Sequence, residues 1–405
     1  MNEQRIPRRV GAPPRICRYS HPHAKDRIVP TLLLMLALMF AGLTAAFPAQ
    51  AITALSRQVV VIDVESRDVL WQKNSTEQMT PSSMTKVMTA YLVFSALNRG
   101  EVSLSTEFVV SERAARRGGS TMLLPAGRKV TVHDLLRGLI VASGNDAAIT
   151  LAEGLAGSEE RFAVLMNQTA AALGMKNTNF VNASGWPEPG HVSTALDMTQ
   201  LGLRLISDHW GYYEYFTASA ITYRGSTFRN RNPILGKLGV DGIKTGRTQD
   251  GGYGVMLSAA ADDGRRVLVV LNGAKNEADR KMDAENLIDW ALTHFDNHSL
   301  FAAGQVIAYA PVWLGTTSHI PLVAKVEVRM TIPVQAYRSL RAQLSYNSPI
   351  PAPIQRGQEV GSLIVTGPGI KPHEVPVLAG ASVDSVGRLE RVSTGIRYIV
   401  FGLPE

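Results

Sequence analysis

The chain has 405 residues, 45% of them hydrophobic and 19% charged, a composition that excludes a disordered protein and suits more than one folded domain. Its formal net charge is +7, but the first 50 residues hold seven of the 41 basic side chains and two of the 34 acidic ones. The remaining body is nearly neutral, with 34 basic and 32 acidic residues, and gives no reason to expect a nucleic-acid partner.

The N-terminal segment has the pattern of an export signal. A basic stretch is followed by an apolar run over residues 32–47, which is too short to span a membrane comfortably with such flanks. The run ends in Ala49-Gln50-Ala51, a small-x-small pattern that suits signal peptidase. We therefore predict a signal peptide over residues 1–51, the alternative being an uncleaved N-terminal anchor. The only cysteine, Cys17, precedes the apolar run, so the exported chain would hold no thiol, no disulfide and no cysteine nucleophile.

Residues 52–298 have the pattern of one mixed domain. The segment over 81–97 is typical of a helix, with an apolar stripe through Met84, Val87 and Met88. Strands flank the helices on both sides, which predicts a sheet assembled from distant parts of the chain. The expected elements are strands over 59–64 and 68–71, helices over 81–97, 131–155 (interrupted at 143–144) and 159–173, strands over 240–244, 253–258 and 267–271, and a helix over 278–295.

Beyond residue 300 the pattern becomes all β. Apolar and polar residues alternate from Lys325 to Ile332, as in a half-buried strand. Shorter strands are expected over 306–314, 363–366 and 375–378. We predict a small β-sandwich domain over residues 299–382.

Residues 383–405 form a basic amphipathic segment. Val386, Leu389, Ile396 and Ile399 fall on one helical face, and arginines lie off it. Such a segment suits a membrane interface, where it would anchor the protein. The alternatives are a frayed tail or a helix docked on the β domain.

Three short motifs carry candidate chemistry, and the first is Ser83-Met84-Thr85-Lys86, the only S-x-x-K in the chain. Residues i and i+3 of a helix share a face, so the hydroxyl of Ser83 and the amine of Lys86 can form a hydrogen bond. A neutral lysine can take the serine proton, which requires burial beside a second cation to lower its pKa from about 10.4 to about 7. Taken alone, the motif is more often a helix-capping serine.

The second and third motifs suit substrate binding. In Ser143-Gly144-Asn145, a hydroxyl and a carboxamide suit a proton relay and a substrate amide. Another S-x-N, at 345–347, lies among prolines in the β domain and is interpreted as a coincidence. In Lys244-Thr245-Gly246, the ammonium and the hydroxyl suit a peptide carboxylate lying alongside the strand. Taken alone, this third motif is as readily a turn at a strand end.

The order S-x-x-K, S-x-N, K-T-G is the pattern of β-lactamases and penicillin-binding proteins. The segments 78–86 (QMTPSSMTK), 134–147 (DLLRGLIVASGNDA) and 240–246 (VDGIKTG) extend the match, and the chain resembles the low-molecular-mass penicillin-binding proteins, the D-alanyl-D-alanine carboxypeptidase family. The resemblance covers about residues 55–380. It implies an α+β fold, in which a β-lactamase/transpeptidase-like serine hydrolase domain is followed by a small β-sandwich domain and a C-terminal amphipathic helix.

The resemblance also implies an activity. The enzyme would remove the terminal D-alanine from peptidoglycan stem pentapeptides through an acyl-enzyme, and β-lactams would inhibit it. Ser83 is implied as the nucleophile, Lys86 as its base and Ser143 as the proton donor to the leaving D-alanine. The implied substrate contacts are Asn145, Lys244, Thr245, Gly246 and Arg247, the last through its backbone N–H, with Arg280 as a looser match. No cofactor is implied, and the expected location is the periplasm, at the surface of the inner membrane.

Two residues depart from the family pattern, and both bear on substrate preference. Arg247 stands where His or Tyr is expected, and Trp186 stands where Leu is expected.

A β-lactamase would need a carboxylate for deacylation, usually in an E-x-x-L-N element, which the sequence does not contain. A D,D-endopeptidase and a non-catalytic penicillin-binding wall protein remain alternatives. His294 and His298 have metal-ligand spacing without an obvious third ligand, so no metal site is predicted, and the oligomeric state is left open.

Overall fold

The structure is a computed structural model and describes residues 16–17, 52–387 and 390–393. Within these residues the chain divides into two compact units. The first comprises Ile52–His294, and the second comprises the other described residues, Ile16–Cys17 and those from Phe295 onward. Each unit has its own hydrophobic core, so each is treated by itself below.

The predicted terminal segments are described only in part. Nearly all of the predicted signal peptide and most of the tail from residue 388 lie outside the described residues. Before that point, the N–H of Val386 donates to the carbonyl of Leu314 at 2.9 Å, so the hydrogen bonding of the β-rich unit continues past residue 382. Among the residues described, no helix is long and apolar enough to cross a membrane.

The first unit is built on five antiparallel strands, in the sheet order β10 (Val240–Thr248), β11 (Gly252–Ala260), β12 (Arg266–Ala274), β2 (Gln58–Asp63) and β3 (Val69–Lys73). Strands from both ends of the unit meet within it, where Val269 lies opposite Val61. This confirms the predicted sheet made from distant segments. Successive residues point to opposite faces, so Val59 and Val61 join one hydrophobic cluster while Val60 and Ile62 join another. β10 is an edge strand of this sheet.

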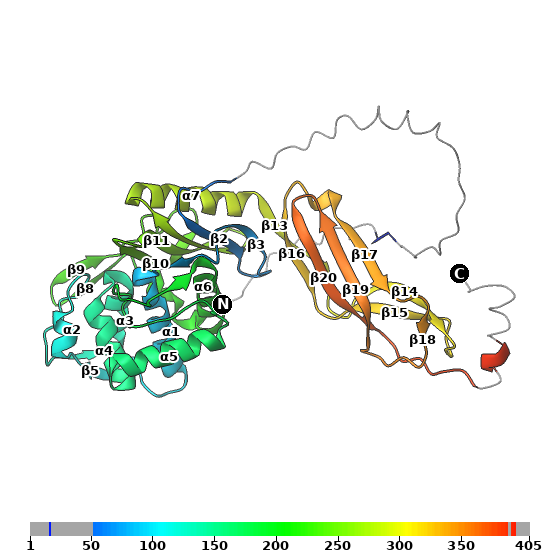
Figure 1. Cartoon of the computed structure of the whole chain (residues 1–405), viewed down its shortest axis with the longest axis horizontal. Helices are drawn as coiled ribbons and strands as arrows, with labels where there is room; N and C mark the ends of the chain where they lie inside the picture. The colour runs from blue at the N-terminus through cyan, green and yellow to red at the C-terminus, as the bar shows by residue number, and fades with distance from the viewer. Residues whose placement is uncertain (1–15, 18–51, 388–389, 394–405) are drawn as a thin grey trace, which may run out of the picture. The chain divides into compact units, whose positions relative to one another are not determined.

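Helices cover both faces of the sheet (Figure 1). On one face lies α7 (Glu277–Thr293), where Leu287 and Ile288 are fully buried against strand residues. The opposite face carries a thicker helical layer that forms the larger of the two clusters. Its helices are α1 (Lys86–Asn98), α2 (Glu112–Arg116), α3 (Val132–Arg137), α4 (Asn145–Ala156), α5 (Glu159–Ala172) and α6 (Ala195–Asp208).

Two of the predicted helices are divided in the structure. The helix expected over 81–97 begins with a 3₁₀ turn, η1 (Ser82–Thr85), and continues as α1. The helix expected over 131–155 consists of α3, a π-helical turn η2 (Gly138–Ala142) and α4. The predicted interruption at 143–144 is confirmed, because Ser143 adopts a left-handed backbone with φ 58°. These two interruptions place a serine at the start of one helix and another between two helices.

Short elements connect the main ones, and these elements, together with α2 and α6, were not predicted from the sequence. The pairs are β4 (Gln78–Met79) with β7 (Ser193–Thr194), β5 (Glu107–Val109) with β6 (Lys129–Thr131), and β8 (Ala220–Tyr223) with β9 (Ser226–Arg229), and a 3₁₀ segment η3 (Trp210–Phe216) follows α6.

The second unit is β-rich. Its described strands are β1 (Ile16–Cys17), β17 (Arg341–Tyr346), β19 (Glu359–Gly367), β20 (Ile370–Ala379), β15 (His319–Ala324), β14 (Val306–Trp313) and β18 (Ile350–Pro351) in one sheet, and β13 (Phe295–Phe301) with β16 (Val328–Pro333) in another. Val328, Met330 and Ile332 are buried, which confirms the alternation over that stretch. The prediction for Val326 is wrong: it is 52% exposed, because the chain passes from one sheet to the other over residues 325–327.

Candidate active site

The turn η1 brings Ser83 and Lys86 together at the start of α1. The Lys86 ammonium nitrogen Nζ lies 3.1 Å from Ser83 Oγ, which confirms the contact predicted from the i, i+3 spacing. Lys86 is only 1% exposed, and its Nζ also donates to Asn145 Oδ1 at 2.8 Å and to the backbone carbonyl of Ser184 at 2.6 Å. The acceptors on Asn145 and Ser184 therefore fix the position of this amine beside the Ser83 hydroxyl.

Burial and neighbouring cations lower the pKa of the Lys86 amine, which favours its uncharged form. Desolvation is the largest influence, followed by the charges of Lys244 and Arg231, and together they hold the pKa of Lys86 well below its ordinary value. Asp146 and Glu159 act in the opposite direction with smaller effect. A neutral amine has a lone pair, so Lys86 can accept the proton of Ser83.

The second motif lies between η2 and α4. Ser143 ends the π-helical turn, is 1% exposed and contributes to the wall of the pocket described below. Asn145 begins α4, and its Nδ2 donates to the carbonyl of Gly118 at 2.9 Å while its Oδ1 accepts from Lys86. Both ends of the Asn145 amide are thus used within the protein, and one end holds the lysine amine in place.

The third motif lies on the edge strand β10, beside η1. A Cβ at Gly246 would lie 3.0 Å from the carbonyl oxygen of Pro81, so glycine lets the strand approach the serine turn closely. Lys244 is 4% exposed, and its burial together with the charges of Arg231 and Arg280 lowers its pKa to about 7. The charge of Lys244 lowers the pKa of Lys86 more than any other single charge does.

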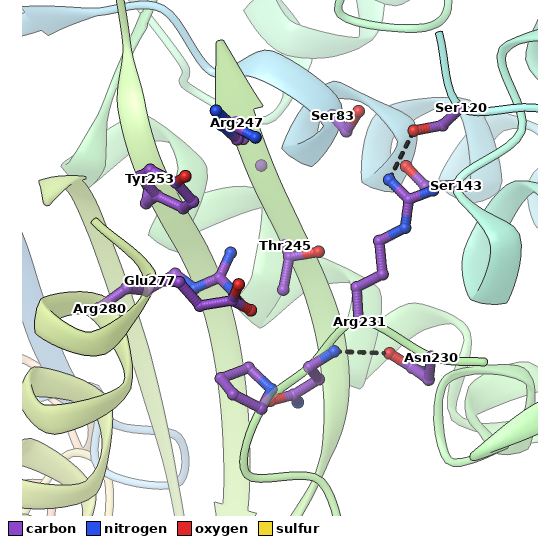
Figure 2. Close-up of a pocket in the computed structure, with 13 residues that line it drawn as sticks. Ser83, Ser120, Ser143, Asn230, Arg231, Thr245, Arg247, Tyr253, Glu277 and Arg280 are labelled. Carbon is purple, nitrogen blue, oxygen red and sulfur yellow. Dashed lines mark hydrogen bonds and ion pairs between the residues drawn. The ribbon is translucent and has the colours of Figure 1, made fainter. Parts of the chain in front are cut away.

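These elements surround a pocket of about 480 Å³. Figure 2 shows Thr245 on the strand, with Arg231 and Ser143 on one side and Tyr253, Glu277 and Arg280 on the other. Of the predicted site residues, Ser83, Ser143, Thr245, Gly246 and Arg247 line the pocket. Lys86, Asn145 and Lys244 are buried and do not line it. The remaining lining residues are Ser120, Asn230, Arg231, Asn232, Pro233, Tyr253, Glu277 and Arg280.

Arg231 and Tyr253 are the main site residues that the sequence did not predict. Arg231 follows the β8–β9 hairpin and donates to Ser120 Oγ at 2.6 Å, in a stretch with no motif. The Tyr253 ring lies under two guanidinium groups, with its centroid 4.8 Å from Cζ of Arg247 and 5.6 Å from Cζ of Arg280. Arg280, the looser match, is indeed in the pocket and pairs with Glu277 at 2.9 Å.

A tight loop sets the position of the Ser184 carbonyl that Lys86 uses. Asn182 Oδ1 accepts from the backbone N–H groups of Gly185 at 2.8 Å, Trp186 at 3.0 Å and Ser184 at 3.2 Å. Gly185 has φ +77°, and any side chain there would collide with the carbonyl of Ser82. Asn182 therefore acts on the site through the loop, as a positioning residue.

We expect Asn182→Ala to slow acylation by a β-lactam about tenfold, because the three N–H groups lose their acceptor and the Ser184 carbonyl shifts away from Lys86. The measurement is the rate of labelling by a fluorescent penicillin. Asn179→Ala is the matched control, since the Asn179 side chain donates only to the carbonyl of Gly190 at an exposed position. Equal labelling rates for Asn182→Ala and the wild type would contradict this role.

Arg231→Gln is expected to move the acid limb of the pH–acylation profile to higher pH by a few tenths of a pH unit. Arg231 lowers the pKa of Lys86 and of Lys244, so its removal lets both pKa values rise, and the neutral base then forms only at higher pH. The shift is small because Arg231 is exposed to solvent. Arg229→Gln, on the exposed end of β9, should leave the limb in place, and a shift to lower pH in Arg231→Gln would refute the argument.

A serine hydroxyl bonded to a buried lysine amine, beside a K-T-G edge strand, is the arrangement of the acyl-transferring serine hydrolases that use lysine as a base. Comparison with known families agrees with this class. Residues 44–275 match the D-alanyl-D-alanine carboxypeptidases of peptidase family S11, and residues 295–385 match the C-terminal domain of penicillin-binding protein 5. The chain belongs to the D-alanyl-D-alanine carboxypeptidase family and is a serine-type D-Ala-D-Ala carboxypeptidase that acts on peptidoglycan, with a β-rich C-terminal domain.

Individual relatives cover most of the chain. D-alanyl-D-alanine carboxypeptidase DacF of Bacillus subtilis is 35% identical over 344 residues, 82% of this chain and 87% of the relative. DacC of Escherichia coli is 36% identical over 369 residues, 88% and 92% respectively. Among solved structures, penicillin binding protein 5 from Haemophilus influenzae has 29% identity and a TM-score of 0.75, covering 83% of this chain and 99% of its own. Penicillin-binding protein D2 from Listeria monocytogenes, in its ampicillin-bound form, has 32% identity and a TM-score of 0.52, covering 59% and 98%.

Proposed function

We propose that Ser83 is the nucleophile and Lys86 its general base. The observation that carries this proposal is the 3.1 Å contact between Ser83 Oγ and the Nζ of a lysine that is 1% exposed. Ser83 Oγ attacks the carbonyl carbon between the two terminal D-alanines while its proton passes to Lys86. The backbone N–H groups of Ser83 and Arg247 stabilise the oxyanion.

Ser143 completes the acylation step. The proton taken up at Lys86 is delivered through the Ser143 hydroxyl to the amine of the departing D-alanine, and the C–N bond breaks. The position of Ser143 in the pocket wall, one residue before the helix that carries Asn145, supports this relay. Water then attacks the ester carbonyl, with Lys86 again taking the proton, and Ser83 leaves with its hydroxyl restored.

The terminal carboxylate lies against Thr245, with positive charge supplied by Lys244 and Arg280. Thr245 and Arg280 line the pocket, and Lys244 lies buried behind Thr245 with a pKa of about 7, so a bound carboxylate favours its protonated form. Asn145 keeps Lys86 in place and reaches the stem peptide when its Nδ2 exchanges the Gly118 carbonyl for a peptide carbonyl.

The test is incubation of the mature protein with a stem pentapeptide. We expect release of one D-alanine per peptide and a tetrapeptide product, and benzylpenicillin should block it, as the ampicillin-bound relative supports. Cleavage of a cross-linked peptide dimer without D-alanine release would favour the D,D-endopeptidase. Labelling by penicillin with no cleavage of either peptide would favour a non-catalytic penicillin-binding protein.

We also propose that the enzyme acts in the periplasm. Residues 1–51 are then a cleaved signal peptide, and residues 299–382 belong to a β-sandwich whose hydrogen bonds continue to Val386. The remainder of the segment 383–405 is an amphipathic helix on the surface of the inner membrane. Deleting the chain after Gly387, which keeps the hydrogen bonds of Val383 and Val386, is expected to move the protein from the membrane fraction to the soluble fraction, and an unchanged distribution would refute the anchor.

A further inference from the structure

The pocket carries more positive charge than one carboxylate requires. Three guanidinium groups line it, from Arg231, Arg247 and Arg280, and Glu277 is the only carboxylate among the lining residues. Lys244, which is buried next to the lining residue Thr245 on β10, adds a further titratable amine. A peptide ending in a single carboxylate leaves at least one of these guanidinium groups without an anionic partner.

Arg247 is the guanidinium group that remains available. Arg280 pairs with Glu277, and Arg231 donates to Ser120 Oγ. Within the described part of the chain, Arg247 makes no ion pair, and its contact is with the face of the Tyr253 ring. It is exposed and lines the pocket, and its planar guanidinium can bind a carboxylate through two hydrogen bonds, unlike the histidine or tyrosine expected from the family pattern.

Strand geometry limits which substrate residues lie near Arg247. β10 is an edge strand, so an extended peptide can pair with its open side. With the terminal carboxylate at Thr245 and the scissile carbonyl at the Arg247 N–H, the peptide runs antiparallel to β10. The scissile carbonyl belongs to the second residue from the C-terminus, so this residue, whose side chain is a methyl group, lies opposite Arg247. The third residue then lies one position further along the strand, about 3.4 Å away, where its side chain is within reach of the long Arg247 side chain.

We infer that the Arg247 guanidinium binds a side-chain carboxylate on the third residue from the C-terminus of the substrate, so that the enzyme prefers stem peptides with a diamino dicarboxylic acid at that position over those with lysine. The inference rests on the proposed catalytic roles and binding direction. Its chemistry is the pairing of a planar guanidinium with a carboxylate, while the ring of Tyr253 holds the guanidinium in place from its other side.

Three tripeptides of the form N-acetyl-X-D-Ala-D-Ala test this inference, with X as α-aminoadipate, its side-chain amide, or lysine. For the wild type we expect kcat/KM for the acid to exceed that for the isosteric amide about fivefold at low salt, with the lysine peptide poorest. Salt on the order of 0.5 M should reduce the ratio of acid to amide. Because the two peptides differ in one group, their ratio is insensitive to any general effect on the reaction.

Variants then assign the preference to one side chain. Arg247→Gln should bring the ratio of acid to amide close to one, and Arg247→Glu should reverse the order in favour of lysine. Arg229→Glu, which changes an exposed charge on β9 outside the lining residues, should keep the wild-type ratio. A wild-type ratio of one, or the same ratio in Arg247→Gln as in the wild type, would overturn the inference while leaving the catalytic proposal intact. Release of D-alanine from none of the three peptides would instead sink the proposed function.

Discussion

Ser83→Ala is expected to abolish D-alanine release from a stem pentapeptide, with a loss of at least about a thousandfold in kcat/KM. Ser83 Oγ is the hydroxyl within hydrogen-bond distance of the buried Lys86 amine, so no other group inherits both its position and its base. The substitution removes one oxygen from a half-buried side chain, and the fold should tolerate it.

The measurement pairs D-alanine release with the intact mass of the protein after exposure to benzylpenicillin. The wild type should gain the mass of one penicilloyl group, and Ser83→Ala should gain none. Ser82→Ala is the matched control, because Ser82 occupies the same turn but its Oγ bonds Thr248 rather than Lys86. That variant should still acylate. A penicilloyl adduct on Ser83→Ala, or its absence on Ser82→Ala alone, would assign the nucleophile elsewhere.

The contact between Ser83 and Lys86 was predictable from the sequence because it is local. An i, i+3 spacing brings the two side chains together in both an α-helix and a 3₁₀ turn, so the unpredicted 3₁₀ start of the helix did not alter it. The predicted burial of Met84, Val87 and Met88 is confirmed, although burial of α1 extends beyond the one predicted face. Local sequence pattern could not predict that the three motifs surround one pocket. That prediction came from the family resemblance.

Other parts of the site have no signature in residue type. The acceptor at Ser184 is a backbone carbonyl, which every residue has, and its position depends on the hydrogen bonds of Asn182. Arg231 comes from an irregular segment and reaches the pocket only because the chain folds back toward Ser120. The failed prediction for Val326 has a related cause, since period-two alternation cannot show where a chain leaves one sheet for another.

The two buried lysines have different tasks, and the charge of Lys244 lowers the proton affinity of Lys86. Lys86 contacts the proposed nucleophile Ser83, and this contact is the reason that we propose it as the base. Lys244, with a pKa of about 7, makes one hydrogen bond, to the carbonyl of Thr245, and acts through its charge. A substrate carboxylate stabilises the ammonium of Lys244, and that added positive charge in turn disfavours protonation of Lys86. Substrate binding therefore increases the difference in proton affinity between Lys244 and Lys86.

Lys86→Arg is expected to reduce the acylation rate about a thousandfold at every pH up to 10. An arginine keeps its proton throughout this range, so it can hydrogen-bond Ser83 but cannot take its proton. In the wild type, by contrast, the rate should fall as the pH drops through the lowered pKa of Lys86, because the protonated amine is no longer a base. The measurement is the rate of penicillin labelling as a function of pH, with thermal melting to show that the variant is folded.

Lys244→Arg is the comparison that separates a base from a charge. It retains a cation behind Thr245, so it should lose far less activity than Lys86→Arg, within about a hundredfold of the wild type. Its pH profile should keep an acid limb, because Lys86 is still present to titrate. If Lys86→Arg acylated within tenfold of the wild type, or if its rate still rose with pH along the wild-type limb, the base would have to be a different group, and the 3.1 Å contact would be structural rather than catalytic.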